Sequence, residues 1–216
     1  MNAITQPDQY QLDRSRHAAP QIFEHLREMI ISMTLIPGTV LSRTDLAAQY
    51  GISQTPVRDA LMRLGEEGLV DIFAQHATVV SAIDVRLARQ AHFLRRSIEL
   101  EVVATLATTA DPLLVANLKT TLNRQRIMLE AEDFKEFALA DQSFHRQMYE
   151  AVEVPDLWPL VRRQSGHLDR LRRLHLPAPG KANAILQDHT RIVDAIAKGD
   201  PVEAQKSLRH HLSGTL

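Results

Sequence analysis

The helical periodicity that runs from Asp84 to the end of the chain constrains the fold more than any other feature. Apolar residues recur there at spacings of three and four, the period of an amphipathic helix, and Pro, Gly and Asp interrupt the pattern. These breaks divide the segment into six predicted helices, at about 84–109, 112–131, 133–152, 155–175, 181–198 and 201–213. Residues 82–216 are therefore predicted to form an all-α helical bundle domain.

Residues 17–81 carry a different pattern. Ser42 and Thr55 are suitable N-caps for two short helices that Gly51 and Gly68 would end, after a first helix that stops at a Pro-Gly turn. The β-prone runs LVDIF and TVVSA flank the four residues AQHA, which predicts a hairpin. The predicted domain has three helices and a two-stranded wing, so the whole chain is expected to be mainly α. The polar, aperiodic residues 1–16 are expected to form a flexible arm.

Composition excludes several classes of protein. The chain has no Cys, which excludes disulfide frameworks, zinc ribbons and thiol catalysis and is typical of a reducing compartment. It shows no signal peptide and no membrane-spanning run, so a cytoplasmic protein is expected. The formal net charge is −1, and the first 80 residues carry six Arg against nine acidic residues. A DNA-binding function must therefore be argued from pattern, because the usual basic signature is missing.

The second and third predicted helices have the arrangement of a helix-turn-helix, whose second helix enters the major groove. The Gln54 amide can pair with adenine, while Thr55 and Arg58 can contact phosphates or bases. A three-helix core with solvated polar residues is the alternative. The predicted contacts to double-stranded DNA are Arg43, Thr44, Ser53, Gln54, Thr55 and Arg58, with His76 at the wing tip.

Ionisable residues occupy the apolar faces of three C-terminal helices. Asp141 and His145, four residues apart, fall inside one apolar stripe, His189 lies in the middle of a second, and His211 flanks a third. An ionised Asp in such a face is costly unless it is paired or binds a metal. One carboxylate and three imidazoles suit a divalent transition metal, with zinc favoured and nickel or manganese as alternatives. Each His taken singly is also compatible with a satisfied core histidine.

The first 80 residues resemble the winged helix-turn-helix of the GntR family. The resemblance covers about residues 20–80 and rests on Pro37-Gly38, Leu41, Leu46-Ala47, Gly51-Ile52-Ser53, Thr55-Pro56-Val57-Arg58, Ala60-Leu61, Leu64 and Glu67-Gly68-Leu69-Val70.

Three positions depart from the pattern of that family. Gln54 and Thr44 stand where many relatives have Arg, and His76 stands where the wing tip usually has Gly. The absence of these two Arg residues lowers the positive charge and changes the bases that can be recognised. The operator sequences of the family are therefore not assigned to this chain. His76 is either a DNA contact or an ordinary exposed loop residue.

The second domain resembles the FCD ligand-binding domain of the FadR subfamily, and its six predicted helices are similar to the VanR-type branch. Metal-binding members have D-x-x-x-H in one helix and single His residues in the last two, which match Asp141, His145, His189 and His211. The resemblance implies a homodimer, a near-palindromic operator, and repression relieved by a small carboxylated metabolite. The effector candidates beside the metal are Arg95, Glu99 and His92 and, less strongly, Arg162 and Arg172.

Three functions stay open on the sequence. The first is a regulator whose operator affinity responds to a metabolite. The second is a metal-dependent enzyme, which is disfavoured because Glu150 and Glu153 lie off the apolar stripe and leave no evident general base. The third is a regulator for which the metal itself is the signal, although the absence of Cys disfavours a soft-metal sensor. The first interpretation is preferred, and no enzymatic activity is expected.

Overall fold

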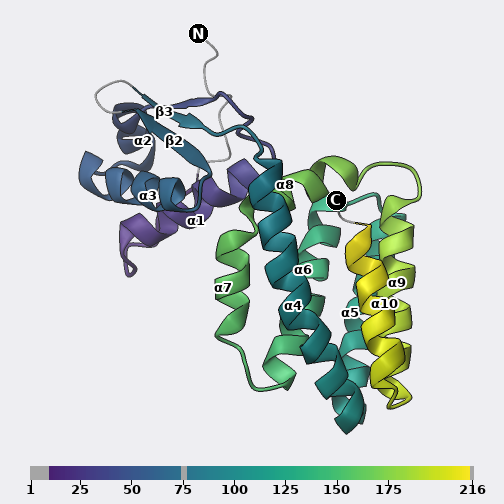
Figure 1. The fold of residues 1–216 in the computed structure, drawn as a ribbon. Helices are drawn as coiled ribbons and strands as arrows, with labels where there is room; N and C mark the ends of the chain where they lie inside the picture. The colour runs from purple at the N-terminus through teal and green to yellow at the C-terminus, as the bar shows by residue number, and fades with distance from the viewer. Residues whose placement is uncertain (1–9, 74–76, 215–216) are drawn as a thin grey trace. The chain divides into compact units, whose positions relative to one another are not determined.

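The computed structural model describes residues 10–73 and 77–214 (Figure 1). The chain divides into two compact units, Met1–Ile83 and Asp84–Leu216, each with an apolar core of its own. This division falls close to the predicted domain boundary between residues 81 and 82.

Three helices of the first unit follow the predicted pattern: α1 (Ala18–Ile31), α2 (Arg43–Tyr50) and α3 (Gln54–Glu66). Ser42 caps α2 by accepting a hydrogen bond from the Asp45 amide at 3.2 Å, and Gly51 ends α2 in the left-handed conformation, as predicted. The prediction of Thr55 as a cap for α3 is wrong. Ser53 holds that position without a side-chain hydrogen bond, because the helix already begins at Gln54.

A three-stranded antiparallel sheet in the order β1-β3-β2 completes the first unit. Strands β2 (Val70–Phe73) and β3 (Ala77–Val80) are the predicted wing, with Ile72 opposite Thr78. Strand β1 (Val40–Leu41) pairs with β3 and was not predicted, because two residues are too few to show an alternating pattern. Fully buried core residues of this unit include Ile22, Leu26, Ile30, Val57, Leu61, Leu64 and Leu69.

Residues 10–16 are packed onto the first unit, which corrects the expectation of a flexible arm for that stretch. Tyr10 stacks on His25 with ring centroids 4.1 Å apart, and Tyr10 and Leu12 contact the apolar core. The Gln21 side chain accepts a hydrogen bond from the Asp13 amide and donates one to the Asp13 carbonyl. Residues 1–9 of the predicted arm lie outside the described residues.

Among its described residues, the second unit consists of helices joined by short turns, as predicted. Its helices are α4 (Val85–Thr109), α5 (Pro112–Glu130), α6 (Phe134–Ala151), α7 (Leu157–Gln164), α8 (Gly166–His175), α9 (Lys181–Ala197) and α10 (Pro201–Ser213). Four of them begin after an Asp whose side chain accepts hydrogen bonds from amides of the first turn, which is why Asp marks the sequence breaks: Asp84, Asp111, Asp133 and Asp200.

The single helix predicted at 155–175 is wrong, because two helices, α7 and α8, meet at Ser165. The Ser165 hydroxyl donates to the Val161 carbonyl at 2.7 Å, and Gly166 follows directly. A Ser-Gly pair is a common cause of a helix break. Gly loses more conformational entropy than other residues when it enters a helix, and the Ser hydroxyl competes with backbone N–H groups for carbonyl oxygens.

Helix α10 packs against α4 and α9, while α5 packs against α6 and α9 (Figure 1). Apolar side chains from these five helices form one core, in which Val103, Leu118, Phe144, Met148, Ile192, Ile196, Leu208 and Leu212 are fully or almost fully buried. None of the described helices combines the length and the apolar character needed to cross a membrane.

Candidate metal centre and DNA-binding surface

Four residues that are distant in sequence converge inside the second unit. Asp141 and His145 project from the same face of α6, His189 comes from α9 and His211 from α10. Each offers one ligand atom, and these atoms all lie within 4.8 Å of one another. All four residues are buried, with exposed fractions of at most 4%. The structure therefore brings together the four residues that the sequence singled out as a donor set.

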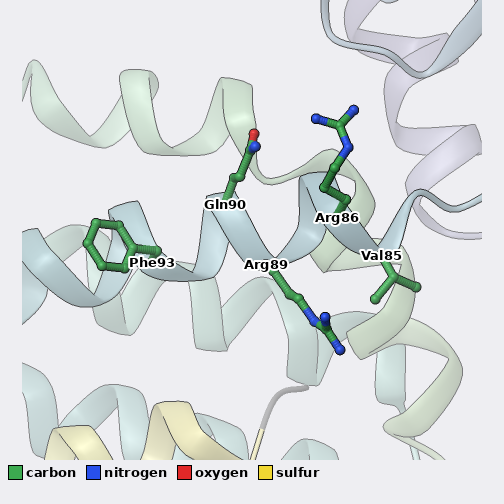
Figure 2. A pocket seen from close by; sticks show the side chains of 5 residues that line it. All are labelled: Val85, Arg86, Arg89, Gln90 and Phe93. Atoms are coloured by element: carbon green, nitrogen blue, oxygen red, sulfur yellow. The ribbon is translucent and has the colours of Figure 1, made fainter.

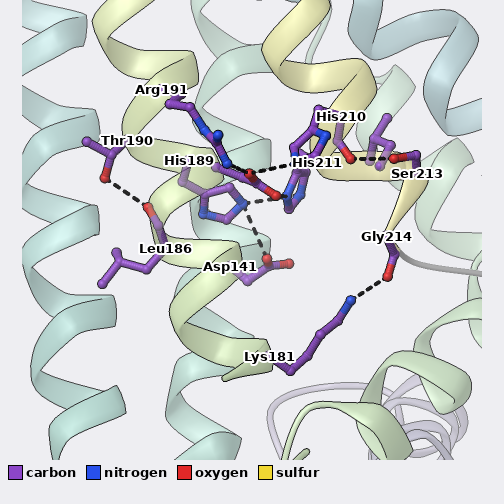
Figure 3. Close-up of polar contacts among 12 residues, drawn as sticks. Asp141, Lys181, Leu186, His189, Thr190, Arg191, His210, His211, Ser213 and Gly214 are labelled. Carbon is purple, nitrogen blue, oxygen red and sulfur yellow. Dashed lines mark hydrogen bonds and ion pairs between the residues drawn. The ribbon is translucent and has the colours of Figure 1, made fainter. Parts of the chain in front are cut away.

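The distances within this cluster suit ligands of one ion. The Nε2 atoms of His189 and His211 lie 3.3 Å apart, and His189 Nε2 lies 3.6 Å from Asp141 Oδ1 (Figure 3). Two nitrogens at about 2.1 Å from a tetrahedral zinc ion lie about 3.4 Å apart. Asp141 Oδ1 and His145 Nε2 are buried and make no hydrogen bond with any described residue. Buried polar atoms of this kind require a partner, and a divalent metal ion fits them.

The other nitrogen of each imidazole lies near a side-chain oxygen, and among the described residues only that of His189 makes a hydrogen bond. His189 Nδ1 is 2.9 Å from the Gln125 amide oxygen on α5, and His145 Nδ1 is 3.1 Å from Glu99 Oε2 on α4. His211 Nδ1 lies 3.8 Å from Asp188 Oδ2 on α9. Gln125 and Asp188 were not predicted from the sequence, because their role appears only once the helices are packed.

Two arginines lie beside the cluster. The guanidinium group of Arg172 donates to Asp141 Oδ2 at 2.8 Å, and that of Arg95 donates to Glu99 at 2.7 Å. Tyr149 also donates to Glu99, at 3.4 Å. Of the predicted effector residues, Glu99 thus lies beside His145 of the cluster and Arg95 pairs with Glu99, while Arg172 contacts Asp141 directly.

The two other predicted effector residues lie in different surroundings. Arg162 pairs with Asp169 at 2.7 Å and lies over the ring of Trp158. His92 Nε2 lies 2.9 Å from the carbonyl oxygen of Leu212, next to His211 in the chain. His92 therefore contacts the C-terminal turn of α10, where it supports the helix that carries His211.

Burial and neighbouring charges prepare the cluster to bind a cation at neutral pH. Burial, reinforced by the Arg95 charge, lowers the pKa of His145 to about 4, and burial likewise lowers the pKa values of His189 and His211. Burial opposes the ionisation of Asp141, but the charge of the Arg172 guanidinium holds its pKa well below the ordinary value. The three imidazoles are thus neutral and the carboxylate is ionised, which are the states that a metal requires.

A separate hollow of about 430 Å³ lies on the outer side of α4 (Figure 2). Its lining consists of Val85, Arg86, Arg89, Gln90 and Phe93. None of the predicted metal or effector residues lines it, because those residues of α4 face the interior of the bundle.

The predicted DNA contacts of the first unit share one property, which is exposure to solvent: Arg43, Thr44, Ser53, Gln54, Thr55 and Arg58. The Gln54 amide nitrogen lies 3.3 Å from the Thr44 hydroxyl oxygen, to which it donates, and Arg58 pairs with Asp59 at 3.3 Å. These groups lie at the first turns of α2 and α3, where a helix-turn-helix contacts DNA. His76 lies outside the described residues.

Comparison with known proteins agrees with this architecture. Residues 18–80 match the profile described as bacterial regulatory proteins, gntR family, and residues 90–214 match the FCD domain. The chain belongs to the GntR family and carries an FCD domain. The two resemblances stated from the sequence are confirmed, and the expectation of a regulator rather than an enzyme is confirmed with them. The VanR-type branch stays a prediction, because the helix count on which it was based changes with α7 and α8.

Relatives of this GntR-family chain are transcription regulators. The chain is 38% identical over 192 residues to an uncharacterized HTH-type transcriptional regulator in an unstable DNA locus of Streptomyces ambofaciens, covering 88% of this chain and 80% of that one. It is 27% identical to the HTH-type transcriptional repressor RspR of Escherichia coli K12, with coverage of 94% and 89%. The solved structure of E. coli McbR/YncC has the same fold, with a TM-score of 0.77, 21% identity and coverage of 92% and 95%.

Proposed function

We propose that this GntR-family regulator is a repressor whose affinity for a near-palindromic operator is controlled by a small carboxylated metabolite, bound beside a divalent metal ion in the FCD domain. The observation that carries this proposal is the buried convergence of Asp141, His145, His189 and His211. The relative RspR is named a repressor, which supports repression rather than activation.

Zinc is the first choice for the metal. Three imidazole nitrogens and one carboxylate oxygen are a zinc donor set, and the absence of Cys excludes a thiolate site. Nickel and manganese accept the same donors in geometries with more ligands. The four residues Asp141, His145, His189 and His211 would hold the ion, and its chemistry would be to bind and orient an anionic ligand.

The charges around the cluster support a carboxylate as the effector. Asp141 supplies one negative charge to the donor set, so a divalent ion bound there leaves a net charge of about +1 in a buried site. Arg172 adds a guanidinium group at 2.8 Å from Asp141, and its side chain stays 18% exposed. A planar guanidinium binds carboxylates with two parallel hydrogen bonds, so a small carboxylated molecule matches this position better than a neutral ligand.

Dimerisation connects the FCD domain to DNA binding in this proposal. A symmetric homodimer would present two winged helix-turn-helix domains to the two half-sites of a near-palindromic operator. Rearrangement of the helices around the effector would change how well both half-sites can be occupied at once, which lowers operator affinity.

The experiment has two stages. Native mass spectrometry with elemental analysis, on protein purified from cells without a metal-binding tag, is expected to show a dimer with one divalent ion per chain. Operator DNA is then selected from a random library, and a panel of small carboxylates is titrated into the complex in the presence and absence of added Zn²⁺. We expect a carboxylate to release the DNA from the wild type but not from Asp141→Ala.

Two outcomes would contradict the proposal. Release of DNA by Zn²⁺ alone, with no carboxylate requirement, would make the metal the signal. Salt-sensitive binding to no DNA sequence at all would contradict the regulator itself.

A further inference from the structure

We infer that Glu99, Gln125 and Asp188 are positioning residues that make all three histidines bind the metal through Nε2, with Nδ1 protonated. This inference rests on the proposed metal site and adds the residues that orient its ligands. Gln125 is hydrogen-bonded to the Nδ1 atom of His189. Glu99 lies at 3.1 Å from His145 Nδ1, Asp188 lies at 3.8 Å from His211 Nδ1, and all three residues are buried.

The chemistry of the three partners fixes the histidine tautomer. A neutral imidazole carries one N–H, and the other nitrogen holds the lone pair that binds a metal. An ionised carboxylate is only an acceptor, so Glu99 and Asp188 favour the hydrogen on Nδ1 of His145 and His211. The Gln125 amide oxygen, 2.9 Å from His189 Nδ1, favours the same tautomer. The lone pair is then left on Nε2 in each ring.

The positions of the Nε2 atoms agree with this assignment. His189 Nε2 and His211 Nε2 are only 3.3 Å apart, and His145 Nε2 is buried without a hydrogen-bond partner among the described residues. With hydrogens on the Nδ1 atoms, three lone pairs face the Asp141 carboxylate. With hydrogens on the Nε2 atoms, N–H groups would crowd the same space.

The three partners differ in charge, which gives the inference a measurable consequence. A carboxylate behind an imidazole makes the imidazole a stronger ligand than a neutral acceptor does. His189 has the neutral partner, Gln125, while His145 and His211 have carboxylates. Gln125→Glu should therefore strengthen metal binding, and Gln125→Leu should weaken it.

The direct test is nitrogen NMR of the zinc-loaded, full-length protein with ¹⁵N-labelled histidine. We expect the three buried histidines to show protonated Nδ1 and zinc-bound Nε2. Zinc bound to Nδ1 of any of the three would overturn the inference, and this measurement needs no variant.

Competition with a chromophoric chelator measures Zn²⁺ affinity in variants. Gln125→Leu and Asp188→Asn are each expected to weaken affinity about 10-fold or more, and Gln125→Glu to strengthen it severalfold. Gln147→Glu is the matched control, because the Gln147 side chain donates its hydrogen bonds to Thr121 on α5 and to Ser143 on its own helix. It should bind Zn²⁺ within about twofold of the wild type. The Co²⁺ absorption spectrum should shift in Gln125→Leu and stay unchanged in Gln147→Glu.

The two failures are distinguishable. If the wild type binds no Zn²⁺, the proposed metal site fails. If the wild type and the Gln125 and Asp188 variants bind Zn²⁺ equally tightly, the metal site stands and the positioning role is overturned.

Discussion

The two units of this regulator treat their functional polar groups in opposite ways. In the first unit the predicted DNA contacts are exposed and few of them bond to one another. In the second unit the four cluster residues are buried, and each is contacted by a side chain from another helix. Hydrated groups cost little before they bind a ligand, whereas buried ones destabilise the fold unless they are paired. Substitutions on the predicted DNA-binding surface should therefore leave the stability of the protein unchanged, whereas substitutions in the buried cluster should lower it.

The largest effect is expected from Asp141→Ala, a substitution in the buried cluster of the second unit. The change removes the anionic donor and leaves Arg172 without its carboxylate partner. Zn²⁺ affinity should fall by more than about 100-fold, because substitution of residues that only hydrogen-bond to the ligands already lowers metal affinity about 10- to 100-fold. The rise in Tm on adding Zn²⁺ should disappear as well.

Calorimetric titration and thermal melting check this expectation, with Glu150→Ala as the control. Glu150 is an exposed residue of the same helix that pairs with Arg146. Unchanged Zn²⁺ affinity in Asp141→Ala would remove Asp141 from the donor set.

Acid should destabilise the metal-free second unit strongly. The pKa of His145 is about 4 in the fold, below its ordinary 6.5, so the unfolded chain takes up the proton first as the pH falls. Stability is therefore lost between about pH 6.5 and 4, by roughly 3 kcal/mol for this residue. The lowered pKa values of His189 and His211 act in the same direction.

Urea unfolding at several pH values, in the presence of a chelator, measures this loss. Fluorescence of Trp158 reports on the second unit, because it is the single Trp of the chain and lies in α7. A free energy of unfolding that stays constant from pH 6.5 to 4.5 would contradict the buried, neutral state of His145.

Arg58→Ala tests the exposed side of the comparison. Loss of a base or phosphate contact should weaken operator binding by about 10- to 100-fold. Arg58 pairs with Asp59 at the surface, and such a pair adds little stability, so Tm and Zn²⁺ affinity should stay unchanged. Gel-shift titration at several salt concentrations gives the affinity. The control, Arg163→Ala, removes an exposed positive charge from the second unit and should leave operator affinity unchanged.

The smallest effect is expected from Thr44→Val. Thr44 accepts a hydrogen bond from the Gln54 amide, and loss of one such bond is worth about 1 kcal/mol, or fivefold in affinity. Selection from a random DNA library should show a weaker preference for adenine at the base pair that Gln54 reads. A loss as large as that of Arg58→Ala would mean that Thr44 contacts DNA itself.

The sequence predicted the helices well because their signals are local. Asp at a break caps the next helix, and Gly51 ends α2, within a few residues of the pattern that reveals them. The break between α7 and α8 was missed, because a Ser-Gly pair bends some helices without ending them, and the helical pattern continues on both sides of Ser165 and Gly166. Strand β1 was missed because its two residues gain their conformation from pairing with β3.

The candidate site divides in the same way. Asp141, His145, His189 and His211 were visible in sequence because an ionisable residue in an apolar stripe is conspicuous on one helix. Gln125 and Asp188 were not, since a polar residue at the margin of a helix face is ordinary until another helix brings an imidazole to it. For the same reason Arg172, on the shorter helix α8, emerged as the direct partner of Asp141 only in three dimensions.

Helix α4 has a consequence for how a signal could leave the site. The first unit ends at Ile83 and α4 begins at Val85, so the sensing domain opens with this helix. Glu99, which contacts His145, lies 14 residues along it, about 21 Å from its start at 1.5 Å per residue. Because a continuous helix is stiff, a displacement at Glu99 would move α4 as a rigid body, including its first turn. In the proposed mechanism, occupancy of the metal and effector site would therefore reach the first unit through the chain segment that precedes α4.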